Sequence, residues 1–206
     1  VESSSSNATA TLKIIGNAEL AFSDGKMLEV GGSNSNNRGA FQANGVTFTA
    51  LDTSTGWSGI YFRNYANDEN SSIDSSIIEY ADDGLYCESA SPTITNSTIR
   101  NNTDGIEANS GSQPTITGNT FTDNTRPVSI YANRIDSTIY GNTYSGNTKD
   151  YIEVQGDYIE DDRTIVWALD NSPYVVVGDV YVRRNNNSSQ LSTLQIASGT
   201  TVKFNS

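Results

Sequence analysis

The sequence contains no histidine and only one cysteine in 206 residues. Without histidine, a histidine general base, a Ser-His-Asp triad and any histidine-containing metal site are excluded. The single cysteine, Cys87, allows neither an intrachain disulfide nor a cysteine-based zinc site, and we expect it to be a buried apolar thiol. The sequence also lacks a run of about 18 apolar residues, so we expect no membrane insertion. Chemistry in this chain therefore depends mainly on carboxylates, hydroxyls and amides.

Basic residues are scarce as well. The 12 Lys and Arg residues stand against 24 Asp and Glu residues, which gives a formal net charge of −12. This excess of negative charge opposes binding to phosphate backbones and to anionic lipid, so we expect no nucleic-acid partner. Hydrophobic residues make up 35% of the chain, a share too low for composition alone to decide between a folded and a disordered chain. The fold has to be inferred from periodicity.

A repeat of about 21–25 residues runs through the middle of the chain, most clearly in residues 72–79, 93–100, 115–122 and 138–145. Thr, Ser or Asn flank each apolar residue, which is the alternation typical of a strand with one buried face. Three apolar columns keep the period: Ile73, Ile94, Ile116 and Ile139; Ile78, Ile99, Phe121 and Tyr144; Leu85, Ile106, Val128 and Ile152. Because the period is too short for a strand followed by a capped helix, the repeat predicts an all-β solenoid.

An asparagine column accompanies these apolar columns, at Asn102, Asn124 and Asn147. Asparagine tolerates the left-handed backbone region, and its side-chain amide can bond to the next coil. We therefore expect these residues to occupy one turn of each coil.

Residues 91–106 and their copy at 113–128 resemble the repeats of the right-handed parallel β-helices of the pectin lyase-like superfamily, in the short-rung form of many surface proteins. The resemblance implies an all-β fold, a right-handed parallel β-helix with rungs of about 21–25 residues. It does not define the activity, because such coils carry lyases, hydrolases, adhesins and inert spacers alike.

The two ends of the chain share a longer-range similarity. At one constant spacing, the apolar residues Leu12, Ile14, Leu20 and Phe22 match Leu194, Ile196, Val202 and Phe204. One interpretation is chance similarity between two generic rungs. The other is that residues 1–182 form one β-helix unit and residues 183–206 are the start of a second copy or a continuation rung. On the second interpretation the chain associates with itself head to tail through these eight residues, and Val202 and Phe204 take the roles of Leu20 and Phe22.

Two aspartates, Asp83 and Asp104, are the candidates for catalysis. Residues 102–105, Asn-Thr-Asp-Gly, are similar to the Asn-Thr-Asp element of polygalacturonases, whose aspartates act as acid and base on a glycosidic bond. The order of the acidic elements differs, however, and the family's histidine and Arg-x-Lys are missing. The other interpretation is a solvated corner column with compensating charges, consisting of Ser58, Asp83, Asp104, Arg126 and Lys149. We expect no enzymatic activity, and Asp83 and Asp104 are catalytic candidates only in the alternative.

The densest acidic run is a weak candidate for calcium and comprises Asp157, Glu160, Asp161 and Asp162. No Asp-x-Asp-x-Asp-Gly loop is present, and such a run is more often a solvated loop. We therefore expect no metal and no cofactor. Trp57 is either a corner aromatic or a platform for sugar stacking.

These features predict a structural repeat module of an extracellular surface, adhesive or filament-forming protein, located at the cell surface. Its predicted partners are further copies of itself, with surface glycans as a second possibility. The alternative function is a carbohydrate-binding or carbohydrate-cleaving β-helix module.

Overall fold

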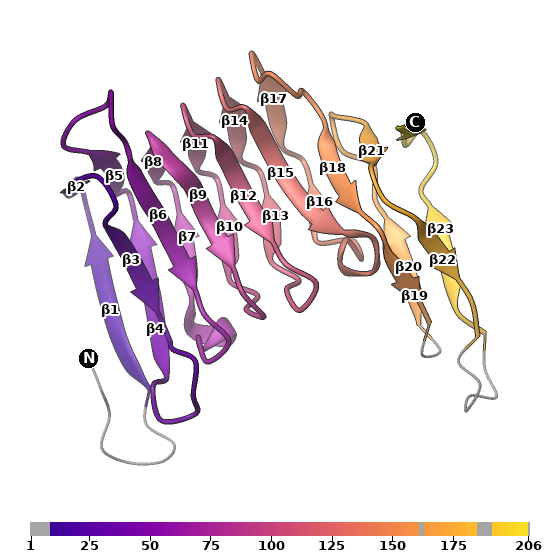
Figure 1. Cartoon of the computed structure of the whole chain (residues 1–206), viewed down its shortest axis with the longest axis horizontal. Coiled ribbons are helices and arrows are strands. Elements are labelled where there is room, and N and C mark those ends of the chain that lie inside the picture. The colour runs from indigo at the N-terminus through magenta and orange to yellow at the C-terminus, as the bar shows by residue number, and fades with distance from the viewer. Residues whose placement is uncertain (1–8, 161–162, 185–190, 206) are drawn as a thin grey trace.

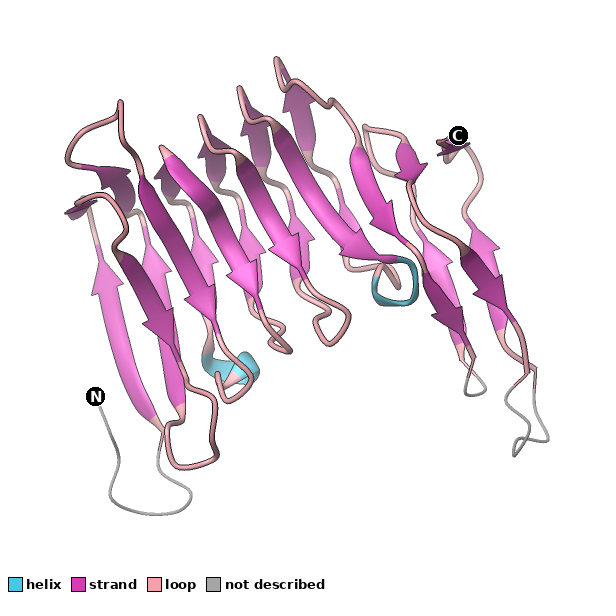
Figure 2. Ribbon diagram, viewed as in Figure 1, coloured by secondary structure: helices cyan, strands magenta, loops and turns pink. Residues whose placement is uncertain are grey.

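The computed structural model describes residues 9–160, 163–184 and 191–205, and nearly all of its regular structure is parallel β-strand (Figures 1 and 2). Successive strands return to the same face of the molecule, so the chain coils into a solenoid whose long axis runs across the strands (Figure 1). Helical structure in the described residues includes two short 3-10 turns, η1 (Asp68–Asn70) and η2 (Ala132–Arg134). No helix in these ranges is long and apolar enough to span a bilayer.

Three long sheets form the walls of the solenoid. Sheet A contains β1 (Ala10–Ile15), β4 (Gly39–Asn44), β7 (Ser72–Asp74), β10 (Thr93–Thr95), β13 (Thr115–Thr117) and β16 (Ile139–Tyr140). Sheet B contains β2 (Glu19–Phe22), β5 (Thr47–Ala50), β8 (Ile77–Glu79), β11 (Thr98–Arg100), β14 (Thr120–Thr122) and β17 (Thr143–Ser145). Sheet C contains β3 (Met27–Val30), β6 (Trp57–Phe62), β9 (Ala81–Cys87), β12 (Asp104–Ala108), β15 (Arg126–Tyr131), β18 (Ile152–Gln155), β21 (Tyr174–Val176) and β24 (Val202–Phe204).

The predicted apolar columns are confirmed by the strand registers. Ile94 pairs with Ile73 on one side and Ile116 on the other, and Ile106 lies in the same way between Leu85 and Val128. These side chains are fully buried and form one continuous core along the solenoid axis. Each coil therefore buries its apolar side chains against the coils on either side of it.

Cys87 belongs to this core, as predicted. Its side chain is fully buried, and burial raises the pKa of its thiol. A thiol that stays protonated in an apolar interior is a poor nucleophile, so Cys87 acts as a small core residue.

Two side-chain ladders join the coils at the corners. In the predicted ladder, the amide of Asn102 donates to Oδ1 of Asn124 at 3.0 Å, and the amide of Asn124 donates to Oδ1 of Asn147 at 3.0 Å. The left-handed backbone expected at these residues is instead found one position earlier, for example at Asn101 and Asp123. The left-handed residue makes the turn itself, and the buried asparagine that follows it turns inward to bond the next coil.

The second ladder, at the corner between sheets A and B, was not predicted. Here the backbone N–H of Ser97 donates to Oδ1 of Asn119 at 2.9 Å, Asn119 donates to Asn142, and Asn142 donates to Asp170. The column changes residue type from serine to asparagine to aspartate along the chain, so no single-letter repeat marks it in the sequence.

The last coils are less regular than the central ones. Two further strand pairs occur here, β19 (Asp157–Ile159) with β22 (Val180–Val182) and β20 (Thr164–Trp167) with β23 (Thr193–Ile196). β20 continues the face of sheet A, because the backbone N–H of Ser137, just before β16, donates to the carbonyl of Val166 at 2.8 Å. Among the described residues, the segments 168–172 and 197–201 contain no sheet B strand.

Half of the predicted match between the two ends of the chain is wrong, because the last coils do not pass through the three sheets in the regular order. Leu20 and Phe22 lie in sheet B, whereas Val202 and Phe204 lie in sheet C, so they do not occupy equivalent positions. The strand of the first coil that corresponds to β24 is β3. The other half is consistent with the structure, since Leu194 and Ile196 extend the same face that carries Leu12 and Ile14.

Candidate functional site

The outer face of sheet C carries the two aspartates singled out in the sequence. Asp104 on β12 pairs with Asp83 on β9 and with Arg126 on β15, so the predicted column is confirmed at these three positions. The prediction that Ser58 continues it is wrong. A register shift between Gly59 and Ile60 places Gly59 opposite Asp83.

Arg126 is the centre of an ion-pair network on this face. Its guanidinium holds both carboxylate oxygens of Asp104 at 2.7 Å, and it also contacts Glu107 at 2.9 Å and Glu153 at 2.6 Å. The charge compensation expected in this column is therefore present. It is not a solvated column, because the Arg126 side chain is only 19% exposed and that of Glu153 only 5%. A bidentate pair at such a site fixes Asp104 in one orientation.

Asp83 is in a different environment from Asp104. Its Oδ2 accepts a hydrogen bond of 2.9 Å from the hydroxyl of Tyr61. Burial raises the pKa of Asp83 to about 6, and the charges of Glu107 and Asp104 act in the same direction, while the Tyr61 hydrogen bond opposes them. Asp83 therefore binds and releases a proton near pH 6, next to a carboxylate held by arginine.

Glu107 is the third carboxylate of the cluster and was not recognised in the sequence. Asp83, Asp104 and Glu107 each offer an oxygen within 4.8 Å of the other two, but the cation that Asp104 and Glu107 already contact is the guanidinium of Arg126. The sequence feature that could have identified Glu107 is its position directly after the inward-facing Ile106. Alternation then puts it on the outer face, beside Tyr86 in the neighbouring coil.

The predicted calcium candidate at residues 157–162 is not assembled in the described part of the chain. Asp157 accepts a hydrogen bond from the backbone N–H of Tyr158, and Glu160 forms an ion pair with Arg183 at 2.8 Å. Asp161 and Asp162 lie outside the described residues. The acidic group close enough to share an ion does not include Asp157 or Glu160.

Trp57 is a core residue of a corner. Its ring is buried and stacks on Phe22, with 4.4 Å between the ring centres, and its Nε1 donates to the carbonyl of Glu79 at 2.9 Å. This confirms the interpretation as a corner aromatic. A buried ring cannot stack on a sugar, so the alternative role of Trp57 is wrong.

Comparison with protein families matches residues 30–168 to the model described as right-handed beta helix region. The chain belongs to the right-handed β-helix family. No curated protein and no solved structure matches it significantly. The handedness follows from the family, and the result is consistent with the resemblance to the pectin lyase-like superfamily. Enzymes and non-enzymes share this fold, so membership defines the architecture and not the activity.

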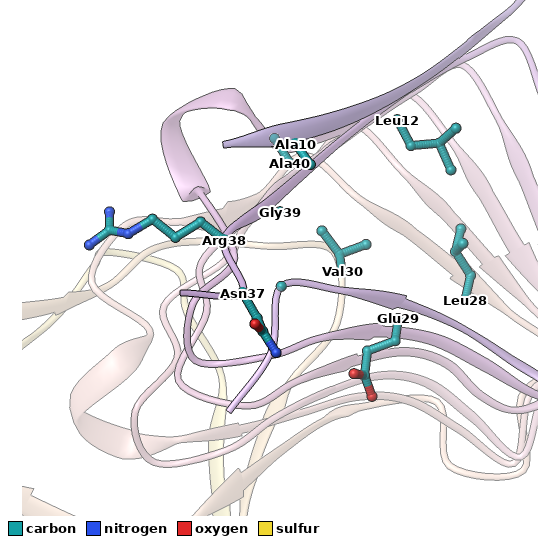
Figure 3. A pocket seen from close by; sticks show the side chains of 10 residues that line it. Ala10, Leu12, Leu28, Glu29, Val30, Asn37, Arg38, Gly39 and Ala40 are labelled. Carbon is teal, nitrogen blue, oxygen red and sulfur yellow. The ribbon is translucent and has the colours of Figure 1, made fainter. Parts of the chain in front are cut away.

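The N-terminal end of this right-handed β-helix exposes its core. Leu12 pairs with Phe41, which is fully buried, so both side chains face the interior; yet Leu12 is 41% exposed because no described coil covers it. Leu28 and Val30 of β3 face inward in the same way, above Ile60 and Phe62. Together with Ala10, Ala40 and neighbouring residues, they line a pocket of about 350 Å³ at this end (Figure 3).

The C-terminal end of the β-helix is open in the same sense. Ile196 pairs with the buried Trp167 and Phe204 pairs with the buried Val176, so both face inward, but their exposed fractions are 42% and 75%. Leu194 and Val202 are the partly buried inward residues of the same two strands. The predicted self-association residues thus lie on the two end coils with their side chains toward the axis.

Proposed function

We propose that this β-helix is a structural repeat module of an extracellular surface, adhesive or filament-forming protein, and that it stacks end to end. The observation that carries the proposal is the exposure of core-facing apolar side chains on both end coils, at positions that are fully buried in the central coils. Exposed apolar patches of this kind are typical of sites that another surface covers.

Two forces favour stacking at these ends. The outer strands β1, β2 and β3 at one end and β23 and β24 at the other have no strand beside them on their outer edge among the described residues, and open edges pair with strands of matching direction. Burying apolar area contributes about 25 cal/mol per Å², or about 1.5–3 kcal/mol for a Phe or Leu side chain. Parallel strand pairing and the burial of apolar side chains therefore both favour end-to-end stacking.

The remaining parts of the proposal rest on other observations. The resemblance to short-rung β-helices of surface proteins supports an extracellular, cell-surface location, and the net charge of −12 argues against nucleic acid as a partner. We propose that the module has no catalytic activity and no cofactor, since the Arg126 network occupies one of the two candidate aspartates.

Sedimentation velocity and negative-stain electron microscopy test the proposal. We expect association that increases with protein concentration and gives particles elongated along the solenoid axis. Phe204→Lys should abolish this association, because it places a charge on the open core. Tyr140→Lys is the matched control, since Tyr140 is also exposed but faces outward from a central coil. A chain that stays monomeric at high concentration contradicts the proposal.

A carbohydrate-binding or carbohydrate-cleaving module remains the second candidate, and one observation favours it. Asp83, with its pKa raised to about 6, lies beside Asp104, and the rings of Tyr61 and Tyr86 form an adjacent pair 5.2 Å apart. Acid–base cleavage of a glycosidic bond needs such a pair of unlike carboxyl groups. We expect no release of reducing ends or unsaturated products from polygalacturonate. Detectable release that Asp104→Asn abolishes would favour the second candidate over the first.

A further inference from the structure

The inference concerns the register in which two copies meet, and it rests on the proposed end-to-end stacking. We infer that β24 of one copy pairs in parallel with β3 of the next copy, so that Val202 lies on Leu28, Phe204 enters the pocket above Val30, and Lys203 faces Glu29. The partner is therefore a second copy of this chain in one defined register.

The columns of sheet C support this register. The column that begins with Leu28 and Ile60 ends with Tyr174 and Val202, and the neighbouring inward column begins with Val30 and ends with Phe204. If each column continues across the junction as it does between coils, Val202 meets Leu28 and Phe204 meets Val30 of the next copy. In this register, each inward-facing side chain of β24 lies on an inward-facing side chain of β3 in the next copy.

The shapes of the two ends are complementary. At the N-terminal end, the floor of the pocket of about 350 Å³ is formed by apolar residues such as Leu28 and Val30, while Glu29, Asn37 and Arg38 line its polar side (Figure 3). At the C-terminal end, Phe204 is the most exposed inward-facing side chain of β24. A large ring placed over a valine fills the space that the shorter side chain leaves.

The charges on the outer face agree with the same register. Lys203 stands between the two inward residues of β24, and its neighbour within its own copy is Val175. Glu29 stands between the two inward residues of β3 and already pairs with Arg63 at 3.1 Å. A shift by one residue would turn Lys203 into the core, and a shift by two would place it opposite Met27 or Gly31. Only the inferred register gives Lys203 a carboxylate.

Sheet A offers a second contact that is compatible with this one. β23 carries Leu194 and Ile196 toward the interior, and β1 carries Leu12 and Ile14 toward it. Continuing the face brings the first pair close to the second, with Gln195 and Lys13 on the outer side of their strands. No like charges meet in this second contact.

Cysteine cross-linking tests the register directly. The double variant Lys203→Cys with Glu29→Cys should form, on oxidation, a ladder of covalent multimers that reducing agent dissolves, because opposed strand residues are within disulfide reach. The matched control is Lys203→Cys with Met27→Cys, whose second site is also outward-facing on β3 but one outward position away. The native Cys87 is buried and stays out of the reaction.

Charge reversal gives an independent reading without cysteines. Lys203→Glu should weaken association about threefold to tenfold at low salt, and adding Glu29→Lys should restore most of the loss. If the chain stacks but the Lys203→Cys/Met27→Cys variant cross-links instead, or neither variant cross-links, the inferred register is wrong. The proposed function is not contradicted by that result. A parent chain that does not stack at all overturns both.

Discussion

Removing the middle rung of the asparagine ladder is the sharpest test of how the coils are held together. Asn124 accepts hydrogen bonds from the backbone and side-chain nitrogens of Asn102 at 3.1 and 3.0 Å, and its amide donates to the carbonyl of Ile99 at 2.9 Å and to Asn147 at 3.0 Å. The residue is only 2% exposed. In Asn124→Ala, water therefore has little access to the groups left behind.

The expected loss follows from these four contacts. A typical intramolecular hydrogen bond contributes about 1 kcal/mol net, and a buried group left without a partner costs about 1–3 kcal/mol. The backbone N–H of Asn102 and the carbonyl of Ile99 both lose a partner in the interior. We expect Asn124→Ala to lower the free energy of unfolding by about 3–5 kcal/mol.

Urea denaturation followed by tryptophan fluorescence and circular dichroism measures this loss, since Trp57 and Trp167 are both buried. The control is Asn36→Ala, the same chemical change at an exposed loop position, which should cost less than about 0.5 kcal/mol. A loss below about 1 kcal/mol in Asn124→Ala, at an unchanged denaturant slope, would refute the view that the ladder stabilises the stack.

Three further outcomes are expected. Ile106→Asp should disrupt several coils, because an unpaired charge in the core costs several kcal/mol, and a retained melting temperature would show that the rung frame is wrong. Arg126→Gln should lower the free energy of unfolding by about 2–3 kcal/mol, whereas Arg183→Gln, at a more exposed ion pair, should cost clearly less; equal losses in urea denaturation would contradict the assigned network. The raised pKa of Asp83 stabilises the fold fully below about pH 4, and this contribution is lost as the pH rises through 6. Asp83→Asn should therefore flatten the pH dependence of the urea midpoint between pH 4 and pH 7, and a variant as pH-dependent as the parent would place its source elsewhere.

The central coils could be predicted from the sequence because their period is regular. The spacing of Ile73, Ile94 and Ile116 determines both the strand positions and the register, since parallel coils stack equivalent residues. The bulge at Gly59 could not be predicted in this way, because one inserted residue shifts the register without changing the alternation around it. Ser58 was misplaced for that reason.

The ends and the carboxylate cluster were predicted only in part. The match between Leu20 and Val202 holds only if every coil contributes a strand to each of the three sheets. The last described coil contributes no strand to sheet B, so the match fails. Asp83 and Asp104 could be identified from the sequence because they occupy the same position in successive repeats. Glu107 and the burial of Arg126 depend on side-chain reach across coils, which spacing alone does not contain.

The two ladders have a direction, and both close on a carboxylate. Each asparagine amide donates one hydrogen bond to a carbonyl of the preceding coil, such as that of Ile99, and one toward the C-terminus, until Asn147 donates to Asp150 and Asn142 donates to Asp170. The carboxyl oxygens of the aspartates accept the hydrogen bond of the last amide, but an aspartate side chain has no N–H to donate to another coil. Aligned amides polarise one another along such a chain of donors, which strengthens the hydrogen bond that the last amide donates. Both ladders therefore end at an aspartate, beyond which sheet C extends through β21 and β24 while the described residues contain no further strand of sheet B.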